Sequence, residues 1–399
     1  MKRVLTRLVG EYQGAAKRTA WKTSTLGDLC DMYQPQTIGT KDLVANGPYP
    51  VFGANGIIGR YDRFNHEEPQ LLITCRGATC GSVNISEPKS WITGNAMVVR
   101  PKNDSIDLKF LEYIFRGGIN ISKAITGAAQ PQITRANLVP LKITFPTNVE
   151  EQQRIVNLLD AADELRKLRA QTDQLTAELI PALFHEMFGD ASHPRNGCVV
   201  LPVGEMIKNG SLLSIQDGNH GEVHPKAAEY LTEGIPFIFA NHIAKNELDL
   251  SSCPFLSVER ARKLRVGFAR PNDVLLSHKG SIGFTAVVPR ELEFAVLSPQ
   301  VTYYRFDTTK IDPFYAWAYF QTASFQATFE RLSRQATRAY VGITRQKELP
   351  FLVAPLPLQK EFAERVSEIR ELKASQSTSR AHLEKLFQSM LQRAFAGEI

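Results

Sequence analysis

The chain repeats itself, and this internal repetition constrains its fold more than any other feature. One phrase occurs twice at an offset of 210 residues: Ile133-Thr134-Arg135 with Pro140, and Ile343-Thr344-Arg345 with Pro350. Other matches keep the same order along the chain: Leu26-Gly27-Asp28-Leu29 with Val203-Gly204-Glu205-Met206, Tyr49-Pro50-Val51-Phe52 with Ile235-Pro236-Phe237-Ile238, Arg76-Gly77 with Lys279-Gly280, and Ile106-Asp107 with Ile311-Asp312. Two copies of one folding unit predict a pseudo-twofold molecule, which suits a partner that also has two halves.

The composition is that of a globular protein. Of the 399 residues, 43% are hydrophobic and 22% are charged, which allows two or three domains with ordinary cores. No segment approaches the roughly 18 apolar residues of a membrane helix, and the basic start of the chain lacks the apolar stretch of a signal peptide. We therefore expect a cytoplasmic protein that makes no use of a membrane. The five cysteines lack CxxC spacing, so free thiols are expected.

The pattern along the chain predicts an α+β fold with two tandem α/β domains and two long helices. After a basic arm at residues 1–20, the ranges 21–148 and 191–348 alternate β-like segments with turns rich in Gly, Asn and Pro. The clearest strand candidates are residues 71–73, 96–99, 274–276, 286–288 and 301–304. Each of these ranges also holds an aromatic helix that an aspartate begins, Asp107 or Asp312. Residues 149–190 predict a long central helix, and residues 349–399 predict a strand followed by a second long helix.

Heptad spacing predicts how the long helices bury their apolar residues. The expected seam of the first helix is Leu158, Ala161, Leu165, Leu168, Thr172, Leu175, Leu179 and Ala182, and that of the second is Phe362, Ile369, Leu372, Leu383, Leu386 and Met390. Such seams need a partner, so we expect an antiparallel coiled coil within the chain. About 30 paired residues would make a spacer on the order of 45 Å, comparable with one turn of duplex DNA. A coiled coil that only dimerises the protein is the alternative.

The charge favours a polyanionic partner. The formal net charge is +6 and the sequence pI is about 9.0. Basic residues crowd two stretches of the second copy: Arg260, Arg262, Lys263, Arg265 and Arg270, and then Arg331, Arg334, Arg338, Arg345 and Lys347. A solvated surface is the other interpretation of each stretch taken alone.

Motifs for catalysis are incomplete throughout the sequence. The stretch Asp312-Pro313-Phe314-Tyr315 lacks the second proline with which an adenine methyltransferase grips its flipped base. The glycine-containing stretches 52–56 and 277–281 lack the spacing of a cofactor or nucleotide loop. His220 and His224 have a spacing compatible with a metal, but no third ligand accompanies them. We therefore expect a chain that is not an enzyme and that holds no metal or cofactor.

The layout resembles the specificity subunits of type I restriction-modification systems. The resemblance covers nearly the whole chain and includes Trp21-Lys22, the stretch Gly53-Ala54-Asn55-Gly56 and the helix entry Glu-Glu-Gln-Gln-Arg-Ile at 150–155. It implies that 21–148 and 191–348 are target recognition domains, each reading one half of an asymmetric bipartite site in double-stranded DNA. The helices would fix the unread gap and dock two methylation subunits, and restriction subunits would join the full complex. S-adenosylmethionine, ATP and Mg are then expected on these partners.

Two other functions stay open on the sequence alone. A self-sufficient DNA methylase or nuclease would make product as a purified chain. A coiled-coil adaptor would bind no DNA, whereas the affinity of a DNA-binding protein for DNA should fall steeply as the salt concentration rises.

Candidate DNA-binding residues lie in turns and loops that differ between the copies. Asn55 and Asn241 follow matched strands, and Arg76 and Lys279 each precede a glycine, where the backbone can approach a phosphate or a base edge. An exposed turn residue is the alternative for all four. The loops before the shared phrase rank highest and contribute Gln130, Gln132, Arg334 and Arg338. The shared Arg135 and Arg345 are expected to hold phosphate or the domain itself.

Overall fold

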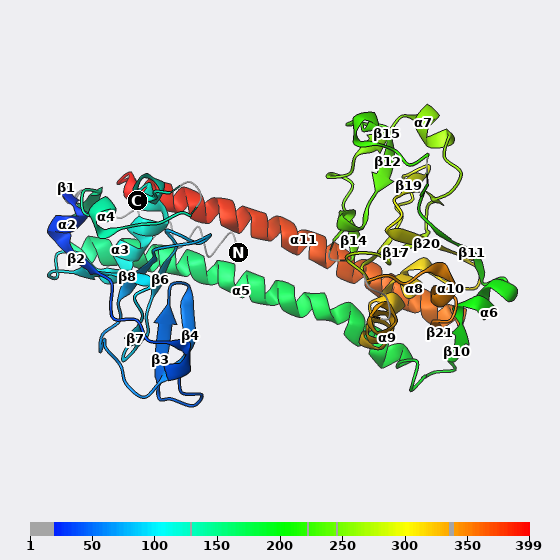
Figure 1. Ribbon diagram of the computed structural model, residues 1–399, viewed down its shortest axis with the longest axis horizontal. Helices are drawn as coiled ribbons and strands as arrows, with labels where there is room; N and C mark the ends of the chain where they lie inside the picture. The colour runs from blue at the N-terminus through cyan, green and yellow to red at the C-terminus, as the bar shows by residue number, and fades with distance from the viewer. Residues whose placement is uncertain (1–19, 128–129, 222, 245, 335–338) are drawn as a thin grey trace. The chain divides into compact units, whose positions relative to one another are not determined.

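A computed structural model describes residues 20–399 except 128–129, 222, 245 and 335–338 (Figure 1). The predicted basic arm thus lies outside the described residues, apart from Ala20. The chain forms two compact units: unit 1 is Met1–Ala170 with Thr378–Ile399, and unit 2 is Gln171–Ser377. Each long helix contributes one part to each unit, so the units are described separately. Among the described residues, none of the helices has both the length and the apolar character needed to span a membrane.

The described residues of unit 1 form three small sheets. The four-stranded sheet has the order β2-β8-β5-β6: Cys30–Tyr33, Ala96–Pro101, Leu71–Thr74 and Val83–Ile85. The three-stranded sheet has the order β4-β3-β7: Gly56–Tyr61, Tyr49–Gly53 and Trp91–Ile92. Strands β1 (Trp21–Thr25) and β9 (Lys142–Pro146) form an antiparallel pair. The helical segments are α2 (Leu26–Leu29), η1 (Thr40–Asp42), α3 (Leu108–Tyr113), the π-helical turn η2 (Ile114–Gly118), η3 (Ile121–Ala124) and α4 (Arg135–Leu138).

In the part of unit 2 that the structure describes, there are four small sheets. The first has the order β11-β20-β17-β18: Leu212–Asp217, Val301–Phe306, Val274–Ser277 and Thr285–Val287. The second has the order β15-β12-β19-β16: Phe255–Leu256, Ile235–Ile238, Ala295–Leu297 and Phe268–Ala269. The two pairs are β10 (Val199–Pro202) with β21 (Pro350–Val353), and β13 (Ile243–Ala244) with β14 (Glu247–Leu248). The helical segments are α6 (Val203–Lys208), η4 (Ala227–Glu229), η5 (Ala240–His242), α7 (Val258–Arg262), α8 (Pro313–Phe320), α9 (Ala323–Ser333) and α10 (Ile343–Gln346).

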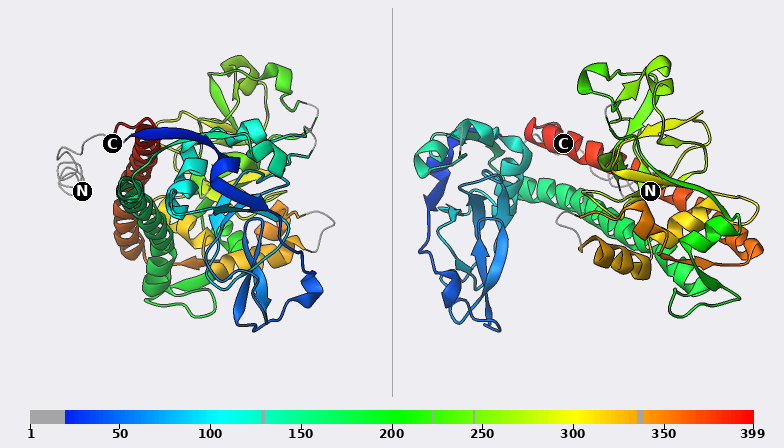
Figure 2. Two further views of the ribbon diagram at one scale, coloured as in Figure 1. Left: turned by 90° about the vertical axis from the view of Figure 1, so that its left-hand side faces the viewer. Right: turned by 45° about the vertical axis from the view of Figure 1, so that its right-hand side comes forward.

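The two units share one topology, which confirms the predicted tandem α+β fold. In the sheets β2-β8-β5-β6 and β11-β20-β17-β18, the order of strands along the chain is first, fourth, second and third. A parallel pair also recurs, with Phe52 opposite Ile92 and Ile238 opposite Leu297. The predicted helix starts are confirmed as well, because the carboxylates of Asp107 and Asp312 accept backbone N–H bonds at the first turns of α3 and α8. In unit 1, α3 packs into one core with the four-stranded sheet and the start of α5 (Figure 2).

The offset of 210 residues, by which the sequence analysis aligned the repeated phrase in the two copies, is wrong by two residues. Thr134 caps α4 and Gly342 occupies the cap position of α10, an offset of 208 rather than 210. The strand pairs give the same offset of 208, because Lys142 lies opposite Thr25 in one unit and Pro350 lies opposite Pro202 in the other. Arg135 and Arg345 are therefore not at equivalent positions, although they share a sequence phrase. A phrase of three residues is short enough to recur out of register, whereas backbone hydrogen bonds define the register directly.

The two long helices are α5 (Val149–Phe188) and α11 (Leu356–Phe395). Helix α5 ends at Phe188, two residues before the end of the range 149–190 predicted for it, and it continues through Pro181. In unit 1 the first part of α5 buries Ile155 and Leu159 in one core with Phe387 and Leu391 of α11. In unit 2 its last part buries Phe184 and Phe188 with Phe362 of α11, and the aromatic rings of Phe184 and Phe362 lie 5.5 Å apart. The helices thus pack against each other in antiparallel fashion within each unit.

The predicted seam of α5 is wrong by about one residue. Leu168, Leu175 and Leu179 are exposed by 49%, 69% and 43%, respectively. The buried positions of α5 are Gln152, Ile155, Val156, Leu159, Ala162, Asp163, Thr176, Ile180, Phe184 and Phe188. On α11, Phe362 and Leu383 are buried as predicted, but Leu372 is exposed. The predicted seam was chosen by the spacing of the leucines, whereas the helix directs its aromatic and β-branched residues toward the core.

A fully buried glutamine near the start of each long helix connects three parts of its unit. The Oε1 of Gln152 accepts the Asp107 N–H at 2.8 Å, and its Nε2 donates to the carbonyls of Ser105 and Pro146, each at 2.9 Å. The Oε1 of Gln359 accepts the Asp312 N–H at 2.8 Å, and its Nε2 donates to the carbonyls of Lys310 at 3.2 Å and Ala354 at 2.7 Å. Each amide therefore ties the long helix to the start of the aromatic helix and to the strand before it.

Replacing Gln152 with Leu should destabilise unit 1. The change leaves one backbone N–H and two carbonyls without their partner, and each unpaired buried group costs about 1–3 kcal/mol. We expect the free energy of unfolding to fall by about 3 kcal/mol or more in a chemical denaturation followed by circular dichroism. The exposed neighbour provides the control, because Gln153→Ala should change stability by less than about 0.5 kcal/mol. Equal stability of the two variants would contradict this role.

Candidate nucleic-acid interface

Two loops of unit 1 pair to form a short two-stranded ribbon. Ribbon 1 consists of residues 75–77 and 131–133. The Ile133 N–H donates to the Cys75 carbonyl at 2.9 Å, and the Gly77 N–H donates to the Pro131 carbonyl at 3.2 Å. Between these bonds Arg76 and Gln132 face each other as an antiparallel bridge. Two residues that the sequence predicted from separate loops are thus side by side.

Unit 2 repeats this construction. Ribbon 2 consists of residues 278–280 and 339–341. The Val341 N–H donates to the His278 carbonyl at 3.0 Å, and the Gly280 N–H donates to the Ala339 carbonyl at 3.2 Å. The central bridge joins Lys279 and Tyr340. Tyr340 was missed by the sequence analysis, because the register of 210 residues pairs Gln132 with Gly342 rather than with Tyr340.

Burial alternates along each ribbon and shows which side chains face the solvent. In ribbon 1 Cys75 and Ile133 are buried, whereas Arg76 and Gln132 are exposed. In ribbon 2 His278 and Val341 are buried, whereas Lys279 and Tyr340 are exposed. Because successive side chains of a strand point to opposite faces, the central pair of each ribbon points outward.

A glycine ends the first strand of each ribbon. Gly77 has a φ of +87° and Gly280 has a φ of +80°, in the left-handed region that L side chains rarely adopt. An added Cβ would meet nothing within 4 Å at either position. Backbone conformation, rather than space, therefore requires glycine here, and the predicted glycine turns after Arg76 and Lys279 are confirmed.

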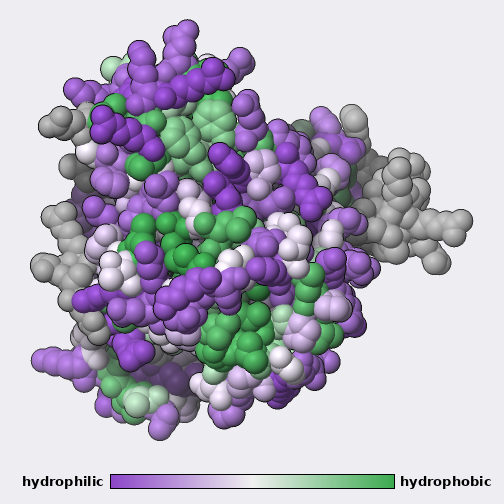
Figure 3. Space-filling view, turned by 90° about the vertical axis from the view of Figure 1, so that its right-hand side faces the viewer, coloured by the Kyte–Doolittle hydropathy of each residue, from purple (hydrophilic) through white to green (hydrophobic). Residues whose placement is uncertain are grey.

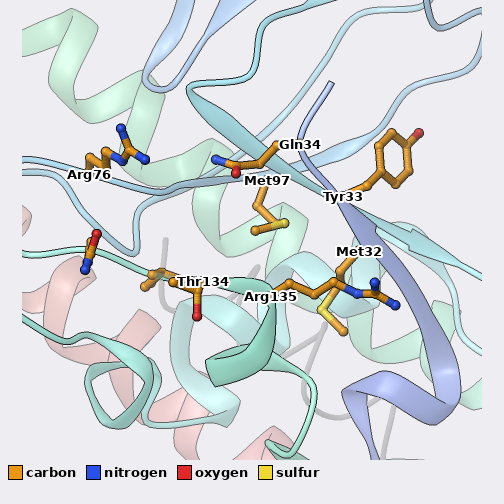
Figure 4. A pocket seen from close by; sticks show the side chains of 9 residues that line it. Met32, Tyr33, Gln34, Arg76, Met97, Thr134 and Arg135 are labelled. Atoms are coloured by element: carbon orange, nitrogen blue, oxygen red, sulfur yellow. The ribbon is translucent and has the colours of Figure 1, made fainter. Parts of the chain in front are cut away.

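A pocket of about 290 Å³ lies beside ribbon 1 (Figure 4). Its lining residues come from strands β2 and β8 and from the ribbon with its continuation: Met32, Tyr33, Gln34, Arg76, Met97, Gln132, Ile133, Thr134 and Arg135. The methionines provide an apolar surface, while Arg76, Gln34 and Arg135 add donors. The pocket thus gathers three of the predicted residues, Arg76, Gln132 and Arg135.

A network of polar side chains lies beside His278, a buried residue of ribbon 2. The Thr302 hydroxyl donates to Asp217 at 2.7 Å, Gln346 donates to that hydroxyl at 3.0 Å, and Tyr304 donates to Gln346 at 2.7 Å. His278 lies above this network, with its Nε2 3.5 Å from the Asp217 carboxylate. Burial lowers the pKa of His278, and the Asp217 carboxylate opposes this effect only in part.

The remaining candidates differ in how firmly they are held. Asn55 and Gln130 are exposed, and Asn55 accepts a 3.0 Å hydrogen bond from Thr74. Asn241 is exposed within η5. Arg334 pairs with Glu330 at 2.5 Å, and Arg345 donates to the Leu332 carbonyl at 3.3 Å, so Arg345 helps to hold its own domain. Arg338 lies outside the described residues.

The other chemical candidates have ordinary surroundings. The Nδ1 atoms of His220 and His224 lie 3.1 Å from the carbonyls of Gly218 and Asn219. Within the described part of the chain, no group of three or more His, Cys, Asp or Glu residues is placed to hold a metal ion. All five cysteines are free, as predicted.

The lowered pKa of His278 predicts a loss of stability in acid. The unfolded chain takes up a proton near pH 6.5 and the folded chain only at lower pH, so stability is complete above about pH 6.5 and falls as the pH decreases through the folded pKa. Denaturation between pH 7.5 and 5 should show a weaker pH dependence in His278→Gln than in the parent chain. The exposed His220→Gln is the control and should keep the parent slope. Identical slopes for all three proteins would contradict the assignment.

Comparison with known proteins shows which family part of the chain is similar to. Residues 19–177 match the family described as the type I restriction modification DNA specificity domain. The chain is 30% identical over 148 residues to the specificity subunit of the type I restriction enzyme EcoprrI of Escherichia coli, which is 36% of either chain. It is 28% identical over 146 residues to the N-terminus of a putative type I specificity subunit of Mycoplasma pneumoniae, which is 35% of this chain and 76% of that protein. The match spans little more than a third of the first relative.

Solved structures share the fold over nearly the whole chain. The S subunit of a type I restriction-modification system from M. genitalium has a TM-score of 0.58 at 19% identity, covering 95% of this chain and 97% of that chain. A chain from a study of complex assembly and conformational transition in the type I R-M system has a TM-score of 0.60 at 17% identity, covering 96% and 100%. The resemblance seen in the sequence is confirmed: residues 19–177 match the type I restriction modification DNA specificity domain, and the chain has the fold of the type I S subunits.

Proposed function

We propose that the chain is the DNA-reading specificity subunit of a type I restriction-modification complex. Each repeat reads one half of an asymmetric bipartite site in double-stranded DNA. The observation that carries this proposal is the pair of ribbons, which share one backbone geometry but expose different side chains. Two sites built alike and bearing different chemistry suit a target whose two halves have different sequences.

The dimensions and charge of the ribbons suit duplex DNA. The major groove admits a two-stranded β-ribbon, and each ribbon exposes a cation, Arg76 or Lys279. The formal net charge of +6 adds a general attraction to phosphate. Arg135 is exposed and can add a phosphate contact, which fixes orientation without reading sequence.

The long helices set the unread gap and dock two methylation subunits in this proposal. Leucines exposed on these helices support a docking role, because Leu175 and Leu179 of α5 and Leu372 of α11 leave apolar surface in water. Elsewhere apolar surface is broken up: on the face shown in Figure 3, hydrophobic patches alternate with hydrophilic ones. Restriction subunits complete the assembly.

We infer that the chemistry of the complex belongs to its partners. S-adenosylmethionine is placed on the methylation subunits, and ATP and Mg are placed on the partner subunits rather than on this chain. This chain selects the sequence and positions the partners, in the cytoplasm where the DNA lies.

Exchanging one repeat should change one half of the recognised sequence. Residues 21–148 would be replaced by the same region of a relative that has a different target, and the chain would be co-expressed with its methylation subunits. Mapping methylated adenines should show one new half-site and one old half-site, because each ribbon is supported within its own unit. The matched exchange of residues 191–348 should alter the other half. Changes in both halves from a single exchange would rule out modular reading, and native mass spectrometry should find two methylation subunits per chain.

Lengthening both helices should lengthen the gap. Thr176 of α5 and Gln376 of α11 form a buried hydrogen bond of 3.1 Å, so duplicating residues 176–179 together with 376–379 keeps both partners of this bond. Four residues add about 6 Å of helix. Because a base pair rises about 3.4 Å, the gap should grow by one or two base pairs with unchanged half-sites. Replacing the exposed Ala177 and Glu178 without a change of length is the control. An unchanged gap would show that the helices do not set it.

A further inference from the structure

We propose that the central pair of each ribbon reads bases directly. Arg76 with Gln132 would read guanine beside adenine in one half-site, and Lys279 with Tyr340 would read guanine beside thymine in the other. This inference rests on the proposed function and goes beyond it, because it names the reading atoms and the bases.

The backbone geometry brings the two side chains of each pair close together. In both ribbons the flanking residues make the interstrand hydrogen bonds, and the central residues make none with each other. This is the non-hydrogen-bonded type of antiparallel pair, in which side chains approach most closely, with Cβ atoms roughly 4.5–5.5 Å apart. Each ribbon therefore presents two side chains to a surface about the size of one or two base pairs.

The chemistry of each side chain indicates its base. An arginine guanidinium can donate two bonds to O6 and N7 of guanine, and a glutamine amide can pair with N6 and N7 of adenine. A lysine ammonium can donate to the same guanine acceptors, whereas an aromatic ring can contact the methyl group of thymine. Tyr340 is 40% exposed and its ring lies 5.5 Å from that of the buried His278, which supports it from below.

The central pairs are available for contact, whereas other cations are engaged within the protein. Among the described residues, neither Arg76 nor Lys279 forms an ion pair. In contrast, Arg260 pairs with Glu229 at 2.5 Å and Arg334 pairs with Glu330 at the same distance. The backbone of Gln132 is also occupied, because its N–H and carbonyl exchange hydrogen bonds with Thr126 at 2.8 and 2.9 Å. Only its side-chain amide remains for recognition.

The pocket beside ribbon 1 allows a base edge to approach the pair. Arg76 and Gln132 both line it, and Met97 and Met32 supply apolar surface. A base edge in this pocket would therefore meet donor groups of Arg76 and Gln132.

Single variants of ribbon 1 provide the first test. The complex with its methylation subunits would be incubated with DNA libraries randomised in one half-site at a time, and bound sequences would be counted. Gln132→Ala should reduce the preference for one adenine, and Arg76→Ala the preference for one guanine, each on the order of 5- to 150-fold and in the same half-site. The control Arg63→Ala removes an exposed cation outside the ribbon and should leave both half-sites unchanged.

Conversion of ribbon 2 into ribbon 1 provides the second test. The double variant Lys279→Arg with Tyr340→Gln should replace guanine-thymine preference in its half-site with guanine-adenine preference and leave the other half-site as it was. All the changed side chains are exposed, and circular dichroism would verify that each variant is folded.

The outcomes separate this inference from the proposed function. A parent complex without any sequence preference would overturn the proposed function itself. A parent complex with a bipartite preference, combined with ribbon variants that weaken binding to all sequences equally, would overturn only the inference and assign the pairs to phosphate. A ribbon 2 conversion that leaves the base preference unchanged would also overturn it.

Discussion

One buried amide in each unit holds together the parts on which the proposed recognition of DNA depends. Gln152 and Gln359 sit in the first turns of the long helices, and each satisfies backbone groups of a helix start and of a strand end. An unpaired backbone group is costly in a core, so this amide fixes the angle at which the long helix leaves its repeat. The same arrangement occurs in both units. Precise reading of DNA needs such a rigid support, because a loose support would let the reading side chains move away from the edges of the nucleobases.

Much of the fold could be predicted from the sequence, because local rules act strongly in it. Aspartate caps, glycine turns and β-branched segments gave correct strands such as β5 and β17 and correct starts for α3 and α8. The helix seam could not be predicted from leucine spacing, since burial depends on which face meets the sheet and the partner helix. Phe184 and Phe362 occupy that face, while Leu175 remains in water. Thr176 and Gln376 bury a polar contact where heptad rules expect apolar residues.

The candidate site was predicted in its components but not in its pairing. Arg76 and Gln132 were both candidates, yet only the backbone hydrogen bonds between residues 75–77 and 131–133 place them opposite each other. Tyr340 was missed because its loop differs in length from the loop that holds Gln132. A repeated phrase of three residues then shifted the comparison by two. Side-chain contacts also separated Arg345, which holds the end of α9, from Arg135, which is exposed. Sequence identity between repeats therefore did not imply identity of role.

The division of the long helices between the units has a consequence for biosynthesis. Unit 2 is continuous from Gln171 to Ser377, whereas unit 1 needs Thr378–Ile399 to complete its core. Phe387, Leu391 and Ala394 fill that core beside residues made more than two hundred positions earlier. On the ribosome, the first repeat must therefore wait with an open apolar face while the second repeat is synthesised and can fold. The order of completion is therefore the reverse of the order of translation.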